Sequence, residues 1–316
     1  MFTVVPESES EILRSSTILL IRLEDIQLGP WVKEEGDALL RRDVTMKVVI
    51  EEVLKGEVEQ QLNEPFGFKV KQRGTGGKRV MDYYGLWSTV ELTEAIKYVA
   101  FCHGASRDAR ILLNEENCEQ LVRPENALED TRAAMALEKA ESTADVPSLA
   151  TDDASKHGQV FARYVAARIK HPLTAAPPSD QPAALAETDI STLSDAAFES
   201  LITLLEAPQT TDEARAAYLT SIYEEVTMKA TTTVEQVSRL VRALFRLLMM
   251  PEAKSLHKNI KEVYLPNLLG LKNPPLRYSA AEIFQGLNDE RLAVLSFLKQ
   301  VPPDTAAPQL VQWLEE

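Results

Sequence analysis

The sequence has few of the features that mark secreted, disulfide-rich or membrane-spanning proteins. Only two of its 316 residues are cysteines, Cys102 and Cys118, which are too few for a disulfide framework, and their separation fits no zinc ligand spacing. No apolar run approaches the roughly 18 residues that a membrane span needs, and the acidic start of the chain is unlike a secretory signal. We therefore expect a cytoplasmic protein without membrane association.

Positive charge and aromatic side chains are also scarce. The chain carries 34 Lys and Arg against 48 Asp and Glu, a formal net charge of −14, and only 6% of its residues are aromatic. This balance disfavours general binding to nucleic acids or anionic membranes, although a local basic patch remains compatible with it. With 45% hydrophobic residues, the composition is that of a globular protein, and the length predicts two domains.

The first third of the chain has the alternation of a β structure. In Val44–Leu54 the apolar residues Val44, Met46, Val48 and Ile50 occupy every second position, as one face of a strand requires. Similar reasoning predicts further strands at Thr17–Asp25, Phe66–Gln72, Arg79–Tyr84, Lys97–Cys102 and Arg110–Leu113. Strands joined by turns without intervening helices predict a small antiparallel β-barrel or sandwich over residues 1–122.

The pattern changes to helical spacing after Asn114. Helices are predicted over Glu115–Ala140 and Gln159–Ile169, and the Pro/Ala-rich segment His171–Ala186 is typical of an extended, semi-rigid connector. We assign residues 123–190 to a helical and Pro/Ala-rich connector. It is the best candidate for a domain boundary.

Residues 191–316 are predicted to be entirely helical. Proline or glycine separates many of the expected helices, at Ser191–Leu205, Thr211–Met228, Val234–Met249, Glu252–Leu269, Leu276–Leu287, Asp289–Lys299 and Ala306–Leu314. Short helices with brief connections form either a multi-helix bundle or a short α-solenoid. We found no repeat period, so the bundle is preferred. The predicted fold class is α+β with two domains.

No group of residues in the sequence has the spacing of a catalytic, cofactor or metal site. The glycine-rich string Gly74–Lys78 lacks the first glycine and the final Ser or Thr of a phosphate-binding loop. Cys102 and His103 are adjacent, so a strand directs their side chains to opposite faces and they cannot act as a nucleophile–base pair. We predict a protein that is not an enzyme and has no cofactor or metal.

An aromatic segment that begins at the end of the fourth predicted strand is the first candidate binding site. It contains Tyr83, Tyr84 and Trp87 beside Gly85. Large amphipathic rings next to a glycine either close the end of a barrel or form an exposed patch for a partner. We take Tyr83, Tyr84 and Trp87 as candidate partner-binding residues.

The densest basic cluster of the chain lies close to these rings, and it comprises Lys69, Lys71, Arg73, Lys78 and Arg79. Because Phe66 and Phe68 alternate with the lysines, an OB-type barrel could hold single-stranded nucleic acid here. The same alternation is required of any half-buried strand. Nucleic-acid binding is therefore an alternative and not the favoured function.

The second candidate binding site lies on the predicted helix Val234–Met249. Arg239, Arg242 and Arg246 follow the spacing of one helix face, and leucines cover the other. Lys254, Lys258 and Lys261 repeat the pattern on the next predicted helix. In a chain of net charge −14, these stripes fit another protein with an acidic surface, although a solvated face paired with neighbouring Glu residues has the same pattern.

Residues 11–122 also resemble a known fold family. Ser15–Thr17 is followed by Val48–Gly56 (VVIEEVLKG) and Lys97–Phe101 (KYVAF), a succession similar to the netrin/TIMP-like OB β-barrels of bacterial proteins. The resemblance implies a barrel and a tendency towards protein binding. It implies no inhibitory residue, because the chain begins Met1–Thr3 and lacks the N-terminal cysteine and the disulfides of metalloproteinase inhibitors.

The favoured hypothesis is a non-catalytic interaction or adaptor protein, such as a bacterial regulatory component. One alternative is a substrate or effector released by proteolysis of the connector in a bacterial signalling or defence pathway. Another is single-stranded nucleic-acid binding by the barrel. The sequence leaves the oligomeric state open.

Overall fold

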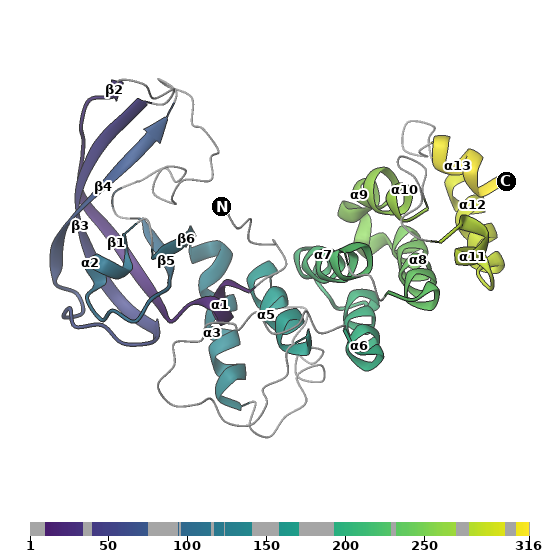
Figure 1. The fold of residues 1–316 in the computed structure, drawn as a ribbon, viewed down its shortest axis with the longest axis horizontal. Helices are drawn as coiled ribbons and strands as arrows, with labels where there is room; N and C mark the ends of the chain where they lie inside the picture. Colours follow the sequence, from purple (N-terminus) through teal and green to yellow (C-terminus); the bar gives the residue numbers. More distant parts are fainter. Residues whose placement is uncertain are drawn as a thin grey trace. The chain divides into compact units, whose positions relative to one another are not determined.

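The structure of the chain is a computed structural model. It describes residues 10–33, 40–74, 94, 96–114, 117–122, 124–140, 158–170, 193–228, 232–269, 278–300 and 308–315. Contacts along the chain group Ser10–Ala140 into one unit, the sheet unit, and Glu141–Ala175 with Glu187–Glu316 into a second, the helical unit. Together they make an α+β structure (Figure 1). The boundaries 1–122, 123–190 and 191–316 remain a prediction.

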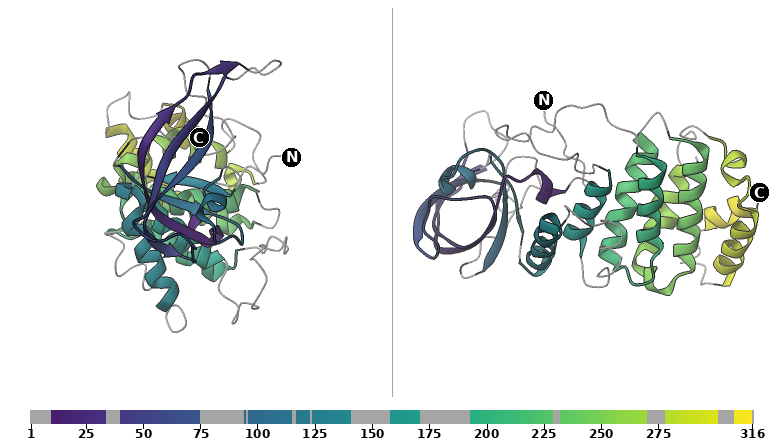
Figure 2. Two further views of the ribbon diagram at one scale, coloured as in Figure 1. Left: turned by 90° about the vertical axis from the view of Figure 1, so that its left-hand side faces the viewer. Right: turned by 90° about the horizontal axis from the view of Figure 1, so that it is seen from below.

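The sheet unit contains an antiparallel six-stranded sheet (Figures 1 and 2). Its strands are β1 (Thr17–Leu28), β2 (Val32–Lys33), β3 (Leu40–Lys55), β4 (Pro65–Gly74), β5 (Lys97–Cys102) and β6 (Cys118–Val122). They pair in the order β4–β3–β1–β5–β6, and β2 pairs with the first residues of β3. The predicted strands at 17–25, 44–54, 66–72 and 97–102 are confirmed, whereas Arg79–Tyr84 lies outside the described residues.

The predicted closed barrel is not what the described strands form. The sheet ends at β4 on one side and at β6 on the other, and within the described ranges no pairing joins these two strands. A sheet closes into a barrel when its first and last strands pair with each other, which requires a matching tilt of the strands and a matching stagger of their register. The alternation that correctly predicted the strands carries no information on that pairing, so the sheet is open where a barrel was expected.

Alternation along the strands builds the main core of the sheet unit. Val44, Met46, Val48 and Ile50 are all at most 4% exposed, as predicted. They pack with every second residue of the neighbouring strands in one cluster, including Leu19, Ile21, Leu23, Phe66, Phe68, Val70, Tyr98, Ala100, Cys102, Cys118 and Leu121. The opposite face is also buried at Ile18, Leu20, Val49 and Val99, and helix α3 (Pro124–Ala140) contacts β3 and β5.

Gly56 ends β3 in a conformation that other residues rarely adopt. Its φ is +77°, and a Cβ built on it would lie 2.6 Å from the carbonyl oxygen of Ser16. Both the left-handed backbone and the close approach to the start of β1 therefore require glycine. This gives a physical reason for the glycine that ends VVIEEVLKG.

The prediction of a strand at Arg110–Leu113 is wrong, because this segment forms helix α2 (Ala109–Leu112). Asp108 caps the helix by accepting a hydrogen bond from the backbone N–H of Arg110, and the Gln60 side chain accepts another from that of Ala109. Asp is a preferred N-cap residue since its carboxylate satisfies N–H groups that lack a partner within the helix. The N-cap therefore stabilises a helix here, although the composition of the segment favours a strand.

The predicted helix Glu115–Ala140 is correct only from Pro124 onward. Its first part contains β6 (Cys118–Val122), which pairs with β5, and α3 begins at Pro124. Proline favours the first turn of a helix and disfavours helical backbone in the residue before it. Helix α1 (Glu11–Arg14), which precedes β1, was not predicted.

The helices of the helical unit agree closely with those predicted. They are α5 (Gln159–Lys170), α6 (Asp195–Glu206), α7 (Asp212–Met228), α8 (Val234–Met249), α11 (Ala280–Phe284), α12 (Asn288–Gln300) and α13 (Pro308–Glu315). The principal contacts are those of α5 with α7, of α6 with α7 and α8, of α8 with α11 and α12, and of α12 with α13. In Figure 2 the colours of these helices run from teal at α5 to yellow at α13.

The predicted helix Glu252–Leu269 is broken into four short elements. These are the 3₁₀ helix η2 (Pro251–Leu256), α9 (His257–Asn259), the π-helical turn η3 (Ile260–Tyr264) and α10 (Leu265–Leu268). Pro266 lacks an N–H and its ring would crowd the carbonyl four residues earlier, so a regular α-helix cannot continue into it. The wide π turn lies where this conflict would occur.

Candidate functional site

Helix α8 is a strongly amphipathic helix with a well-defined start. The Thr233 hydroxyl accepts a hydrogen bond from the N–H of Gln236, and the Gln236 side chain accepts one from the N–H of Thr233. This reciprocal capping box satisfies two N–H groups at the helix start. One face of α8 is buried, and its residues are Val237, Leu240, Val241, Ala243, Leu244, Phe245, Leu247 and Leu248. The three predicted arginines lie outside this buried set.

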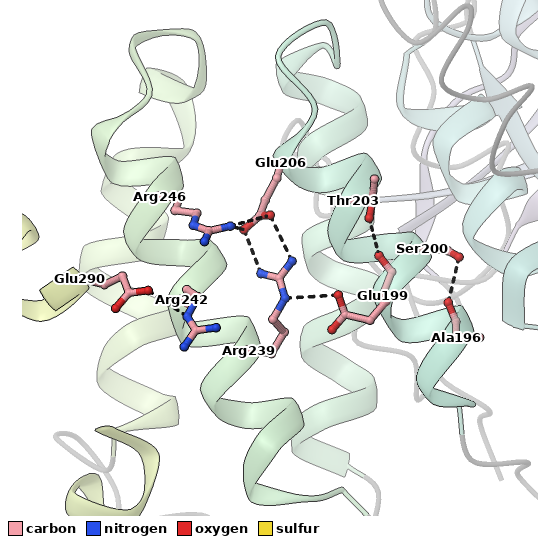
Figure 3. A network of polar contacts seen from close by, with 9 residues as sticks. All are labelled: Ala196, Glu199, Ser200, Thr203, Glu206, Arg239, Arg242, Arg246 and Glu290. Atoms are coloured by element: carbon pink, nitrogen blue, oxygen red, sulfur yellow. Dashed lines mark hydrogen bonds and ion pairs between the residues drawn. The ribbon is translucent and has the colours of Figure 1, made fainter. Parts of the chain in front are cut away.

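The structure places Arg239, Arg242 and Arg246 in ion pairs with the helices on either side of α8 (Figure 3). Two nitrogens of Arg239 donate to the two carboxylate oxygens of Glu206 on α6 at 3.0 and 3.1 Å, and its Nε donates to Glu199 at 3.3 Å. Arg246 donates to the same Glu206 at 3.2 and 3.3 Å. Glu206 is thus shared between two arginines.

Arg242 faces the opposite neighbour. Its Nε lies 3.0 Å from a carboxylate oxygen of Glu290 on α12, and its Nη2 donates to the carbonyl of Gly286 at 3.3 Å. The ion pairs therefore extend from α6 across α8 to α12. We call these six residues, Glu199, Glu206, Arg239, Arg242, Arg246 and Glu290, the arginine ladder.

The members of the arginine ladder differ in how much of each side chain reaches solvent. Arg239 and Glu206 are 21% and 17% exposed, whereas Arg246 is 48% exposed. Burial lowers the pKa of Arg239, but the hydrogen bonds and charges of Glu206 and Glu199 outweigh it and raise that pKa above its usual value. Arg239 is therefore a fixed, charged centre between α6 and α8, and Arg246 is its solvent-facing neighbour.

Hydroxyl groups beside the ladder on α6 are engaged within their own helix. The Ser200 hydroxyl donates to the carbonyl of Ala196 and the Thr203 hydroxyl to that of Glu199, each at 2.8 Å (Figure 3). The charged side chains of the ladder are therefore the groups on this surface that make polar contacts between helices. Pairing of this arginine face with neighbouring Glu residues, the alternative given by the sequence, is confirmed. The particular glutamates were not predicted, although the spacing of Glu199 and Glu206, two helical turns apart, indicates that they share a face.

The second basic stripe, formed by Lys254, Lys258 and Lys261, spans η2, α9 and η3, along which the helix changes from 3₁₀ to α to π geometry. Lys254 and Lys258 are exposed, while Nε2 of His257 lies 3.0 Å from the carbonyl oxygen of Leu247 and 3.2 Å from that of Met250. An imidazole N–H that donates to these carbonyls caps the end of α8. His257 thus has a structural role here.

The aromatic candidates Tyr83, Tyr84 and Trp87 lie outside the described residues, as does the connector His171–Ala186. Binding by these rings and proteolysis of the connector both stay predictions.

The basic strand predicted as a nucleic-acid surface is β4. Phe66 and Phe68 are 7% and 8% exposed and belong to the core of the sheet unit, and Arg110 lies over the Phe66 ring, 5.3 Å from its centroid. Lys69 forms an ion pair with Asp43 at 2.7 Å. Stacking of bases requires accessible rings, so these two phenylalanines do not provide it.

Cys102 is the last residue of β5, and His103 follows the end of that strand. Cys102 is in the core, whereas Nδ1 of His103 lies 2.7 Å from the carbonyl oxygen of Arg14. The sequence analysis missed that β6 brings Cys118 directly opposite Cys102. Both residues are free cysteines, and the two thiols are hydrogen-bonded to each other.

Within the described ranges, no three His, Cys, Asp or Glu side chains come together in a way that could hold a metal ion. A small cavity in the helical unit is lined by Val226, Thr227, Thr232, Val237, Leu268, Tyr278 and Ile283. Its lining is mostly apolar, and the Tyr278 hydroxyl donates to the backbone carbonyl of Thr232 at 2.7 Å. None of the helices that the structure describes is both long and apolar enough to cross a bilayer.

Comparison with known proteins found no matching family model, no similar curated protein and no similar solved structure. The resemblance of residues 11–122 to netrin/TIMP-like barrels therefore stays a prediction.

Proposed function

We propose that this chain is a non-catalytic protein-binding protein, and that the arginine ladder of the helical unit binds an acidic segment of a partner protein. The observation that carries the proposal is the arrangement of Arg239 and Arg246 around one carboxylate. Glu206 holds both guanidinium groups, and Arg246 keeps 48% of its side chain exposed. A partner carboxylate that reaches Arg246 would extend an ion-pair network that already exists.

Preorganisation is the physical argument for binding at this place. An arginine that is free in solution loses side-chain entropy when a partner orders it, which costs about 0.5–1.5 kcal/mol per side chain. Arg239 is held by Glu199 and Glu206, and Arg242 by Glu290 and the carbonyl of Gly286, so much of this ordering precedes binding. Both contacts between Arg246 and Glu206 use Nη1 of the arginine, whereas a guanidinium has five N–H donors.

The packing of the helices supports the same function. Helices that contact mainly their neighbours in the chain are typical of α-solenoids, which bind other proteins along extended surfaces. In this protein α6 contacts α8 and α8 contacts α12, and the arginine ladder joins all three helices. We therefore prefer the short α-solenoid to the bundle for the helical unit.

Affinity capture with matched variants tests the proposal. The full chain, Arg246→Glu and Lys299→Glu are each tagged and recovered from the native host with their partners. Lys299 is a suitable control because it is 52% exposed and forms a surface ion pair with Glu315, which is not part of the arginine ladder. We expect one stoichiometric partner with the full chain and with Lys299→Glu, and its loss with Arg246→Glu. Equal recovery with both variants would contradict the proposal.

A further inference from the structure

The two cysteines of the chain occupy opposed positions on adjacent antiparallel strands. Cys102 is the last residue of β5 and Cys118 the first of β6, and they are register partners. Both side chains belong to the same core cluster and are at most 1% exposed. They are the only cysteines in the sequence, so any disulfide within one chain must join them.

The geometry at this position allows a covalent bond between the two sulfur atoms. The register of β5 with β6 shifts between Phe101 and Cys102, and this shift sets Cys102 opposite Cys118, where their thiols are hydrogen-bonded to each other. Residues that face each other on antiparallel strands have Cα atoms about 4.5–5.5 Å apart, within the range of about 4.4–6.8 Å that disulfides span.

The protein environment keeps the reduced pair unreactive in the closed sheet. The hydrogen bond to Cys118, followed by burial, raises the pKa of the Cys102 thiol far above its usual range. Thiolates are the reactive species in disulfide exchange, so reaction requires β6 to separate from β5. Among the described strands, the five-residue β6 pairs with β5 alone and lies at the end of the sheet. Short terminal strands open at a lower free-energy cost than the rest of a sheet.

We infer that Cys102 and Cys118 form a site of reversible intrachain disulfide formation, which covalently fixes β6 to β5. The reagent is a low-molecular-weight disulfide such as oxidised glutathione. One cysteine thiolate attacks it, giving a mixed disulfide and one glutathione thiolate. The second cysteine thiolate then attacks the mixed disulfide, closes the Cys102–Cys118 bond and releases the second glutathione thiolate. The protons of the two cysteine thiols end on the two glutathiones, so both cysteines are oxidised and the reagent is reduced.

Fixing β6 in this way should stabilise the sheet unit without rearranging it. The disulfide would close a loop of about 15 residues that includes α2. A closed loop of that size lowers the conformational entropy of the unfolded chain, which should raise the Tm of a domain of this size by about 10 °C. Since the two side chains already face each other within the core, the native strands need not move apart to accept it.

The test uses the full chain in a series of reduced and oxidised glutathione buffers. Low urea concentrations are included so that β6 can open, and free thiols are blocked by alkylation before mass spectrometry. By mass spectrometry we expect a monomer that has lost two hydrogens and a disulfide-linked pair of peptides that contain Cys102 and Cys118. The rate of disulfide formation should increase with the urea concentration. The oxidised protein should have a higher Tm, and dithiothreitol should reverse that increase.

The variants Cys102→Ala and Cys118→Ala serve as matched controls, each leaving one thiol. Each should give only a single glutathione adduct and no rise in Tm on oxidation. The inference is overturned if the wild-type protein keeps two alkylatable thiols after refolding in excess oxidised glutathione. It is also overturned if oxidation gives only adducts or linked dimers, or if the intrachain disulfide lowers Tm.

Discussion

Arg215 is the largest fully buried side chain among the described residues, with 1% exposure. Its Nη2 donates to the carbonyls of Ala207 and Pro208 after α6, and its Nη1 to the carbonyl of Glu252 in η2. It also forms an ion pair with Asp212 at the start of α7. One guanidinium thus satisfies carbonyls of the connection that precedes α7 and of η2, which follows α8.

Replacing this side chain with an apolar one of similar length should destabilise the helical unit strongly. Arg215→Met leaves the carbonyls of Ala207, Pro208 and Glu252 without this donor, and we expect the free energy of unfolding to fall by about 2–4 kcal/mol. Urea unfolding followed by circular dichroism measures the change. The surface control Lys299→Met should change it by less than about 0.5 kcal/mol. Equal effects of the two substitutions would show that the buried contacts of Arg215 contribute little.

Glu51 gives a residue-scale prediction that depends on pH. Burial raises its pKa, but hydrogen bonds from Lys97 at 2.5 Å and Arg22 at 3.0 Å outweigh burial and hold that pKa below the usual value of 4.5. A carboxylate with a lowered folded-state pKa stabilises the fold fully above the unfolded-state pKa. It loses that contribution as the pH falls through the folded-state pKa.

Glu51→Gln should therefore lower the free energy of unfolding at pH 7, by about 1 kcal/mol. The difference from wild type should shrink as the pH falls from about 4.5, where the unfolded state begins to take up the proton, through the lower folded-state pKa, where wild-type Glu51 itself becomes protonated and neutral. Urea titrations at several pH values measure this difference. A difference that stays constant from pH 7 to the acid limit would contradict the assignment of the charge pairs. Glu57→Gln, in an exposed pair with Arg107, is the control.

At the scale of elements, Gly56 fixes how β3 ends beside β1. Gly56→Ala should lower the free energy of unfolding by about 2 kcal/mol or more, since φ is +77° and the new Cβ would lie 2.6 Å from the Ser16 carbonyl oxygen. Gly67→Ala in β4 is the matched control, because a Cβ there has no neighbour within 4 Å, and it should be neutral or slightly stabilising. Chemical denaturation of both variants compares them. A neutral Gly56→Ala would mean that the turn after β3 adapts.

The arginine ladder makes a second prediction at this scale. Arg239→Met removes both the two-bond contact with Glu206 and the contact with Glu199, and should reduce the free energy of unfolding by about 1–2 kcal/mol. Arg246→Met removes a more exposed contact and should cost less than about 0.5 kcal/mol. Denaturant unfolding of the two variants tests this order. The reverse order would show that Arg239 does not hold α6 to α8.

The elements show which parts of a sequence determine local structure. Alternation predicted β1, β3, β4 and β5, because their apolar residues at every second position must face one core. The same alternation gave a wrong prediction at α2, where the N-cap of Asp108 stabilises a helix. It also missed β6, whose five residues are held in a strand by pairing with β5. Contacts between distant segments are not encoded in local periodicity, and the open edge of the sheet went unpredicted for the same reason.

At the scale of the whole molecule, the candidate site was partly predictable. Helical spacing placed Arg239, Arg242 and Arg246 together on one face of α8. Their partners Glu206 and Glu290 come from α6 and α12, and only the packing of these helices brings them within reach. The sequence also could not indicate that Cys118 lies opposite Cys102, since that follows from the pairing of β5 with β6.

The most direct test of the account is the affinity of the captured partner for three purified proteins: wild type, Arg246→Glu and Lys299→Glu. We predict that Arg246→Glu binds at least about tenfold more weakly, that it folds with a Tm only slightly below that of the wild type, and that Lys299→Glu binds like wild type. Equal Kd values for wild type and Arg246→Glu, with both proteins folded, would contradict binding at the arginine ladder.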